Sequence, residues 1–367
     1  MANPMSKILV LTNHSYMLYR FRLALLLQLR QRHEVVISTP FVGHEQDFQA
    51  LGMRCIETQV DRRGINPLRE IELLRFYRQL LRQEKPDLVI TYSIKPNIYG
   101  GYLCRRAGIN YCVNVQGLGS AFERRPLALL VSRMYRTALR GARTVFFENT
   151  VNAETFVRHK IIPEGQCTVL SGAGIDLEQY SPAPYPENAP IRFLYLGRIM
   201  REKGIDELFH AARLLRQAGV DFTLDLVGFY EDEYKQEVEQ LGREGIARFH
   251  GFQQDPRPFY AAADCVVMPS YHEGMSNVLL EAAAMARPVI TTAIPGCREA
   301  VQEGVSGFLC RPRDTEDLLR AMQEMARLPR KQRAAMGEAG REKMERQFDK
   351  KQVVQTTLRA IFPDENA

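Results

Sequence analysis

Two glutamates at the ends of one short segment carry the strongest chemical signal in the sequence. Glu273 and Glu281 enclose the run EGMSNVLLE, in which a loop leads into an apolar helical pattern. Ser276 and Asn277 are natural N-cap residues, so free amides are expected to face a ligand there. A carboxylate one turn into a helix can accept both hydroxyls of a ribose, and a loop carboxylate can hold sugar hydroxyls or an anomeric centre that gains positive charge. The alternative for each glutamate is a surface acid near a helix start.

A second motif precedes this segment in the chain. The strand pattern IRFLYLG (191–197) leads into GRIMREKG (197–204), and a helix is expected over about 205–218. Glycine lets the backbone approach a ligand, a helix start supplies N–H groups, and Arg198 and Lys203 add two cations. A solvated turn is the alternative for this motif alone. Together the two motifs favour a diphosphate site.

Both motifs belong to a repeated alternation of apolar strands with amphipathic helices, which is typical of parallel sheets covered on both faces. A segment rich in Gly and Pro interrupts the pattern at 171–190. We therefore expect an α/β protein with two Rossmann-like, doubly wound domains, 1–182 and 183–348, and an interdomain cleft. The tail is expected to be helical, with 349–367 packing back on the first domain. Strands are expected at 7–12, 34–39, 87–92, 111–115 and 144–149, and then at 191–197, 221–228, 264–270 and 288–292.

The overall composition is that of a folded, cytosolic protein with reduced thiols. Of the 367 residues, 45% are apolar and 25% charged, and the start MANPMSKILVL leads into a strand pattern rather than a signal peptide. No stretch approaches the roughly 18 apolar residues of a membrane helix. The seven cysteines are scattered, odd in number and without a CxxC pair, which favours free core thiols. The sequence contains no DxD or HExxH motif, so no metal site is expected.

The two motifs together resemble the donor half of glycosyltransferase family 4, which has the two-domain GT-B fold. GRIMREKG, MPSYHEGMSNVLLEAAAMARPVI and the interdomain segment GAGIDLEQYSP carry a resemblance that covers nearly the whole chain. It implies a retaining transferase that uses a UDP-sugar and needs no metal or other cofactor. It also implies that Glu273 is the catalytic residue facing the transferred sugar. The donor-binding residues that it implies are Gly197, Arg198, Lys203, Phe252, Gly274, Met275, Ser276, Asn277, Val278 and Glu281.

The loops of the first half lack the glycine pair common in the family and resemble a subgroup that extends sugars on undecaprenyl diphosphate. These loops are at 12–22, 91–101 and 114–122. The subgroup builds capsules, O-antigens and bacterial N-glycans, so the implied acceptor is a polyprenyl-diphosphate-linked saccharide. A lysine at the sheet edge could hold that diphosphate, although a solvated lysine and a structural histidine are the alternatives. The acceptor-binding residues expected are Asn13, His14, Lys95, Gly117 and Gly119.

Positive charge is concentrated in the first half of the chain. Residues 1–182 carry 24 Lys and Arg against 15 Asp and Glu, whereas residues 183–367 carry 25 against 28. A helix expected over 126–143 carries four arginines spaced three or four apart: Arg133, Arg136, Arg140 and Arg143. Such a helix could rest on an anionic membrane, or it could be a core helix with a solvated face. We expect a peripheral protein on the inner face of the cytoplasmic membrane. Nucleic acid is not expected, because no basic aromatic strand or helix-turn-helix pattern is present.

Two other functions remain compatible with this architecture. A UDP-sugar 2-epimerase would convert UDP-GlcNAc to UDP-ManNAc without an acceptor. A non-catalytic sugar-binding subunit of a polysaccharide complex would bind UDP without forming product. The combination of GRIMREKG with EGMSNVLLE fits a transferase better than either.

Overall fold

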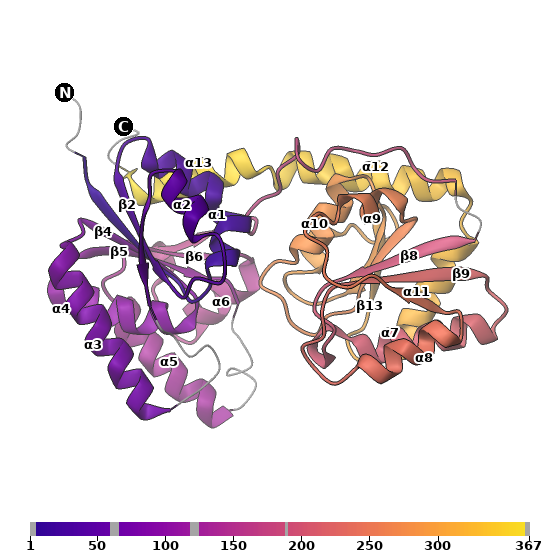
Figure 1. The fold of residues 1–367 in the computed structure, drawn as a ribbon, viewed down its shortest axis with the longest axis horizontal. Helices are drawn as coiled ribbons and strands as arrows, with labels where there is room; N and C mark the ends of the chain where they lie inside the picture. Colours follow the sequence, from indigo (N-terminus) through magenta and orange to yellow (C-terminus); the bar gives the residue numbers. More distant parts are fainter. Residues whose placement is uncertain (1–4, 59–65, 118–124, 188–189, 364–367) are drawn as a thin grey trace. The chain divides into compact units, whose positions relative to one another are not determined.

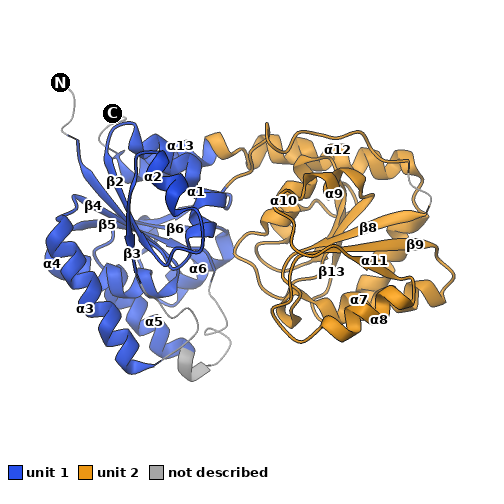
Figure 2. Ribbon diagram, in the orientation of Figure 1, with its two compact units in different colours: residues 1–173, 352–367 blue, residues 174–351 orange. Residues whose placement is uncertain are grey.

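A computed structural model describes residues 5–58, 66–117, 125–187 and 190–363 of the chain. The chain divides into two compact units, residues 1–173 with 352–367 (unit 1) and residues 174–351 (unit 2), as Figure 2 shows. Each unit contains one parallel sheet with helices on both faces (Figure 1). Two Rossmann-like α/β units are thereby confirmed. Among the described helices, none combines the length and the apolar character needed to cross a bilayer.

The sheet of unit 1 has the strand order β3-β2-β1-β4-β5-β6-β7, and every pair in it is parallel. Successive side chains of a strand point to opposite faces. Leu9 therefore packs with the core under one set of helices, and Val10 with the core under the other. The strands are β1 (Lys7–Leu11), β2 (Glu34–Thr39), β3 (Arg54–Glu57), β4 (Leu88–Tyr92), β5 (Asn110–Val115), β6 (Thr144–Phe147) and β7 (Cys167–Val169).

The helices of unit 1 begin where the sequence supplies caps. Asn66 accepts a hydrogen bond from the N–H of Leu68 and is followed by a proline at the first helical position, which starts α3. Asn149 caps α6 in the same way. The helices are α1 (Ser15–Arg30), α2 (Glu45–Ala50), α3 (Pro67–Glu84), η1 (Pro96–Gly100), α4 (Gly101–Ala107), α5 (Arg125–Leu139), α6 (Thr150–Arg158), η3 (Glu164–Gln166) and the C-terminal α13 (Lys350–Ile361).

The sheet of unit 2 has the order β10-β9-β8-β11-β12-β13 and is also parallel. Its strands are β8 (Ile191–Leu196), β9 (Phe222–Val227), β10 (Ala247–Phe249), β11 (Cys265–Met268), β12 (Val289–Thr292) and β13 (Gly307–Cys310). Its helices are η4 (Arg201–Lys203), α7 (Ile205–Gln217), α8 (Lys235–Arg243), α9 (Arg257–Ala262), α10 (Asn277–Ala284), η5 (Arg298–Ala300), α11 (Thr315–Arg327) and α12 (Arg330–Gln347).

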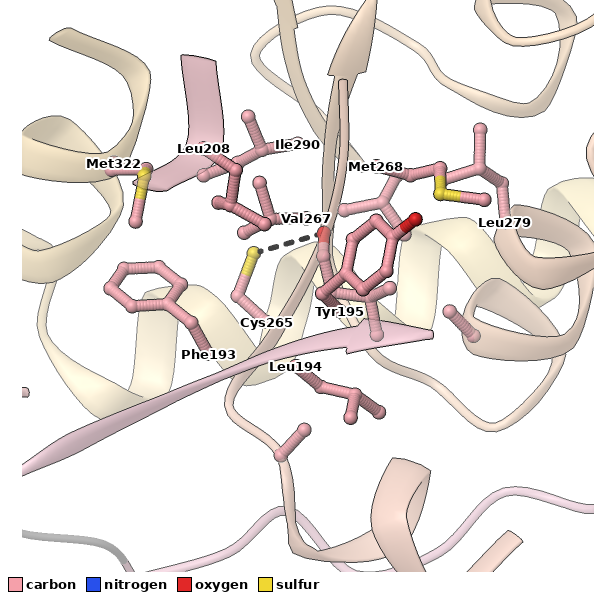
Figure 3. Close-up of a cluster of buried hydrophobic side chains, with 14 of the residues drawn as sticks. Phe193, Leu194, Tyr195, Leu208, Cys265, Val267, Met268, Leu279, Ile290 and Met322 are labelled. Atoms are coloured by element: carbon pink, nitrogen blue, oxygen red, sulfur yellow. Dashed lines mark hydrogen bonds between the residues drawn. The ribbon is translucent and has the colours of Figure 1, made fainter. Parts of the chain in front are cut away.

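The core of unit 2 is formed where β8 and β11 pack against their helices. Figure 3 shows Phe193 and Cys265 of these strands beside Leu208 of α7 and Met322 of α11. Burial raises the pKa of the Cys265 thiol well above its usual value. All seven cysteines are free, and five of them are buried as expected of core thiols, whereas Cys55 and Cys167 are only partly buried.

The segment after residue 173 belongs to unit 2, which places the boundary earlier than the expected 182/183. The N–H of Ile175 donates to the carbonyl of Phe348 at 2.7 Å, and the N–H of Lys350 donates to the carbonyl of Ile175 at 3.0 Å. Arg287 of the same unit is fully buried and donates to the carbonyls of Ala183 and Pro184 at 3.1 and 2.8 Å. These hydrogen bonds to main-chain carbonyls hold the proline-rich segment on unit 2.

Candidate active site

The two motifs lie on neighbouring strands of unit 2. GRIMREKG follows β8 and the EGMSNVLLE loop follows β11, and these strands are paired in the sheet. The carboxyl ends of parallel strands meet at one edge of a sheet, where ligands of such folds bind. The loops after β9 and β10 emerge at the same edge. The sheet order therefore brings together segments about seventy residues apart in sequence.

A lysine–glutamate ion pair joins the two motifs. Lys203 Nζ lies 2.5 Å from Glu273 Oε1, and Ser270 Oγ donates to the same oxygen at 3.0 Å. Only 14% of the lysine side chain and 13% of the glutamate side chain are exposed. An ammonium carries three donors, so Lys203 can hold Glu273 and still reach a phosphate oxygen. The structure thus places a carboxylate and a cation, both nearly buried, at one point of the sheet edge.

Two glycines keep these loops in close contact. Gly204 has φ +70°, and a Cβ built on it would lie 2.0 Å from the carbonyl oxygen of Pro269. The N–H of Tyr271 also donates to the carbonyl of Glu202 at 2.9 Å. Gly296 has φ +85°, and its Cβ would lie 2.5 Å from the carbonyl oxygen of Gly274. Gly204 was expected from its motif, whereas Gly296 carried no sequence signal beyond the Pro-Gly turn that contains it.

Tyr195 is a site residue that the sequence did not indicate, because it reads as an ordinary strand residue of β8. Its ring is fully buried and its hydroxyl donates to the carbonyl of Arg198 at 2.6 Å. Burial raises the pKa of Tyr195 well above its usual value of 10, and the negative charge of Glu273 raises it further. The hydroxyl therefore stays protonated and fixes the backbone of the first loop.

The guanidinium of Arg198 points toward the loop after β9 and not toward the Lys203–Glu273 pair. Its Nη1 lies 3.7 Å from Glu231 Oε1, and the side chain is 38% exposed. An exposed guanidinium next to a carboxylate can exchange that partner for a phosphate at little cost. Arg198 is therefore accessible to a ligand at the edge of the site, while Lys203 is at its base.

Glu281 is buried in the first turns of α10. Its residue exposure is 5%, and its Oε2 accepts a hydrogen bond from the hydroxyl of Tyr260 at 2.9 Å. Tyr260, a fully buried residue of α9, fixes the orientation of the carboxylate. A carboxylate can accept several hydrogen bonds, so a ribose hydroxyl could donate to the same group. Ribose binding by Glu281 stays a prediction.

The Tyr260→Phe variant tests how much this bond contributes. Loss of a buried hydrogen bond to a charged group is expected to lower the free energy of unfolding by about 1.5–3 kcal/mol and to weaken UDP binding. The matched control is Tyr234→Phe, because the Tyr234 hydroxyl donates to the exposed Asp206 at 2.6 Å. Water replaces that bond, so the control is expected to change stability by less than about 1 kcal/mol. Equal losses in chemical denaturation would contradict the assignment.

The start of α10 differs from the expected cap. Ser276 is the N-cap residue and Asn277 is the first helical residue, yet the Ser276 side chain forms no capping bond. Its Oγ is buried and has no partner among the described residues. The N–H of Ser276 donates to the carbonyl of Gly296 at 2.8 Å. A helix start attracts anions through the remaining N–H groups of its first turn.

Other residues expected to bind the donor contribute in different ways. Phe252 is 56% exposed, and its ring centroid lies 6.3 Å from that of Phe229, which is 45% exposed. These two rings follow β10 and β9 and form an aromatic surface of the size that a base stacks on. Met275 is buried in the core and Val278 packs against it. The side chain of Met275 therefore belongs to the core, whereas that of Val278 is only partly buried.

Four of the five residues expected to bind the acceptor follow β1, β4 or β5, at the corresponding edge of the unit 1 sheet. Asn13 follows β1 and accepts a hydrogen bond from Ser93, which follows β4, at 2.6 Å. Lys95 Nζ lies 2.5 Å from Glu70 Oε1, and both side chains are mostly buried. His14 precedes α1, and its side chain does not cap it. Gly117 follows β5, and Gly119 lies outside the described residues.

A buried ion pair at the same edge was missed in the sequence. Arg22 Nη2 of α1 lies 2.5 Å from Glu148 Oε1, directly after β6. The guanidinium also lies 5.5 Å from the ring centroid of Tyr92. Nothing in the sequence distinguishes these residues from other charged residues near helix and strand ends.

Both halves of the chain match known glycosyltransferase families. Residues 7–149 match the family described as glycosyl transferase 4-like, and residues 190–327 match glycosyl transferases group 1. The chain is 24% identical to N,N'-diacetylbacillosaminyl-diphospho-undecaprenol alpha-1,3-N-acetylgalactosaminyltransferase of Campylobacter jejuni, over 82% of this chain and 84% of that protein. It is 32% identical to the lipopolysaccharide core biosynthesis glycosyltransferase LpsE of Rhizobium meliloti, over 48% of this chain and 51% of LpsE.

Solved structures show the same fold. The crystal structure of Anabaena HepE in complex with UDP and glucose superposes with a TM-score of 0.81 at 18% identity and covers 98% of this chain and 100% of HepE. A sucrose-phosphate synthase from Thermosynechococcus elongatus superposes with a TM-score of 0.77 at 20% identity, over 96% of this chain and 98% of that protein. At these identities the likeness concerns the fold.

Proposed function

Because the chain belongs to the glycosyltransferases of family 4, which have the GT-B fold, we propose that it is a retaining enzyme using a UDP-sugar. The acceptor in this proposal is a polyprenyl-diphosphate-linked saccharide, and the transferred sugar is an N-acetylhexosamine or a hexose. The single observation that carries the proposal is the contact between Lys203 and Glu273, which unites both motifs at one sheet edge. The products are chains of a capsule, an O-antigen or an N-glycan.

The similar proteins support the two substrates separately. HepE is a structural neighbour in complex with UDP and glucose, which supports a UDP-sugar donor. The Campylobacter relative is named for a diphospho-undecaprenol acceptor, which supports a lipid-linked acceptor. An enzyme that uses a lipid-linked acceptor works at a bilayer. We therefore propose that the protein is peripheral on the inner face of the cytoplasmic membrane. The positive charge of the first half of the chain favours an anionic surface.

In the proposed donor complex, each group meets a part of UDP that its chemistry suits. The diphosphate lies between Lys203 and the N–H groups at the start of α10, and Arg198 closes over its outer side. Glu281 accepts the ribose hydroxyls. The exposed ring of Phe252, with Phe229 beside it, stacks on the base.

Transfer then follows from the charges of the site. As the bond between the anomeric carbon and the phosphate oxygen breaks, negative charge grows on UDP and positive charge on the sugar. Lys203 and the helix start stabilise the first, and the carboxylate of Glu273 stabilises the second. The acceptor hydroxyl attacks from the face that UDP leaves, and its proton passes to the departing phosphate. Among the described residues no group of three His, Cys, Asp or Glu is arranged around a metal position, and the proposal includes no metal.

A donor screen tests the proposal directly. The protein is incubated with UDP-GlcNAc, UDP-GalNAc, UDP-Glc or UDP-Gal together with a lipid extract of the producing cell, and UDP release is measured. One donor is expected to release UDP only when the extract is present, with a longer glycolipid as the second product. Conversion of UDP-GlcNAc to UDP-ManNAc without extract would instead establish the epimerase. Tight UDP binding without any product would establish a sugar-binding subunit.

The Arg198→Ala variant is expected to weaken UDP binding about tenfold or more, since a charge-assisted bond to phosphate contributes about 1.5–3 kcal/mol. Calorimetric titration with UDP measures the change. Arg201→Ala is the matched control in the same loop, because the Arg201 side chain is 78% exposed and lies 3.7 Å from Asp206. Its affinity for UDP is expected to stay unchanged. An unchanged affinity in Arg198→Ala would remove Arg198 from the donor site.

A further inference from the structure

A hollow lined by arginines lies at the amino edge of the unit 1 sheet, the edge opposite to Asn13 and Lys95. It has a volume of about 870 Å³ and is bounded by the ends of α4 and α5 and by the segments that lead into β6 and β7. Four of its lining residues are arginines: Arg105, Arg136, Arg140 and Arg143. A concave site with four guanidinium groups attracts an anion strongly.

The arginines of the hollow are not neutralised by acids. Arg136 donates to the carbonyls of His159 and Lys160 at 2.8 Å, and Arg143 donates to the carbonyl of Ile361 at 2.7 Å. No carboxylate among the described residues forms an ion pair with any of the four. Two of them are fixed by backbone carbonyls, and Arg105 and Arg140 keep their donors for a ligand.

An apolar hollow adjoins the arginine hollow, because Thr137 of α5 lines both. It has a volume of about 320 Å³ and lies between α3, α4 and α5. Leu130 lines it with 57% of its surface exposed, and Leu129 beside it is 74% exposed. Leu68 of α3, a helix that also lines this hollow through Leu74, is 71% exposed. Its apolar lining includes Leu74, Ile98, Tyr99, Tyr102, Leu130 and Met134.

We propose that this face of unit 1 binds an anionic phospholipid of a bilayer. The phosphate sits among the arginines, the neighbouring acyl chain lies along the apolar hollow, and the exposed leucines enter the interface. Guanidinium groups suit phosphate because two of their N–H groups can bind one phosphate together. The inference rests on the proposed function in one respect, since a lipid-linked acceptor requires the enzyme to work at a bilayer.

This site differs from the basic helix face expected from the sequence. The helix ends at Leu139 instead of continuing to residue 143, so Arg140 and Arg143 lie beyond it. Arg133 lines the apolar hollow, and Arg105 of α4 takes its place in the arginine hollow. The cationic and apolar groups therefore come from α3, η1, α4, α5 and the segment after α5, and not from two stripes of one helix.

Sedimentation with vesicles tests the proposal in the absence of any sugar substrate. Phosphatidylcholine vesicles with and without phosphatidylglycerol are compared for the wild type and for R105A/R140A. A basic residue near an anionic surface contributes about fivefold in affinity, so the double variant is expected to bind the anionic vesicles about 30-fold more weakly. The control R243A/R248A removes the same charge from exposed positions of unit 2 and is expected to bind as the wild type does.

The apolar part is tested by L129S/L130S, which is expected to bind the anionic vesicles about tenfold more weakly. All variants are expected to keep wild-type UDP affinity, so a failure of donor binding counts against the proposed function and not against this site. Wild-type vesicle binding by R105A/R140A, or an equal loss in the control, would overturn the phospholipid site. Full competition by free glycerol phosphate, with no effect of L129S/L130S, would replace the lipid by a free phosphate ester. If R105A/R140A does not fold, the single variant R140A is compared with the wild type in the same vesicle assay.

Discussion

Glu273→Gln is expected to slow sugar transfer by about 100- to 1,000-fold, the usual loss when one charge-stabilising group is removed from an active site. The amide keeps the size of the side chain and the contact with Ser270, but it cannot balance positive charge at the anomeric carbon. The variant also frees Lys203, whose ammonium lies 2.5 Å from the carboxylate. The diphosphate then meets one more available cation and one fewer negative charge. UDP is therefore expected to bind as tightly as to the wild type, or more tightly.

This opposite response of turnover and affinity separates a catalytic role from a structural one. Turnover is measured with saturating donor, and UDP affinity by titration of the same preparation. The control Glu324→Gln changes an exposed carboxylate of α11 and is expected to alter neither quantity. Loss of the buried partner of Lys203 lowers the melting temperature in either case, whereas a purely structural role for Glu273 would also weaken UDP binding.

The central strands of both sheets could be predicted from the sequence, whereas the edge strands could not. β1, β4, β8 and β11 are covered on both faces, so they form predominantly apolar runs, which are typical of buried parallel strands. The four strands that the sequence did not predict are β3, β7, β10 and β13, and each lies at the end of its sheet. An edge strand such as β7, with the pattern CTV, is short and half-exposed, so its pattern resembles a loop.

The residues of the candidate site that belong to a local sequence motif could be predicted. Those that reach the site only because distant segments are neighbours in the fold could not. Lys203 and Glu273 each stand in a loop with recognisable glycines and a following helix, so both were expected to belong to the donor site, although their ion pair was not predicted. Tyr195 and Phe229 were missed because a strand tyrosine and a loop phenylalanine also occur in ordinary cores. Their roles depend on which strands are neighbours, and that order emerges only when the sheet is assembled.

Ion pairing changes the interpretation of the predicted cations. Lys95 was expected to offer a free charge to the acceptor diphosphate, and the structure pairs it with Glu70 of α3. Lys203 is paired with Glu273 in the same manner. A phosphate that approaches either lysine competes with a nearly buried carboxylate, so each site combines attraction with a local negative charge. The sequence shows which cations are present. The carboxylate that competes with a phosphate for each lysine comes from a distant segment and is seen only in the fold.

Gly204→Ala is expected to disrupt the donor site more severely than any single side-chain removal. The added Cβ would lie 2.0 Å from the carbonyl oxygen of Pro269, which belongs to the loop that carries Glu273. Since both partners of this contact are main-chain atoms, the loops themselves must separate. Lys203 directly precedes Gly204, so its ammonium would move away from Glu273. We expect UDP binding to weaken about 100-fold and the free energy of unfolding to fall by more than about 3 kcal/mol.

Gly219→Ala provides the control that isolates the contact from the backbone strain. Gly219 has φ +77°, close to the +70° of Gly204, but a Cβ there meets no atom within 4 Å. Both variants carry the left-handed penalty of about 1 kcal/mol, which corresponds to a fall in melting temperature of about 2–4 °C. Only Gly204→Ala adds the collision, so its melting temperature is expected to fall by about 10 °C. Equal shifts in the two variants, with UDP affinity retained in both, would mean that the two loops are not held together through Gly204.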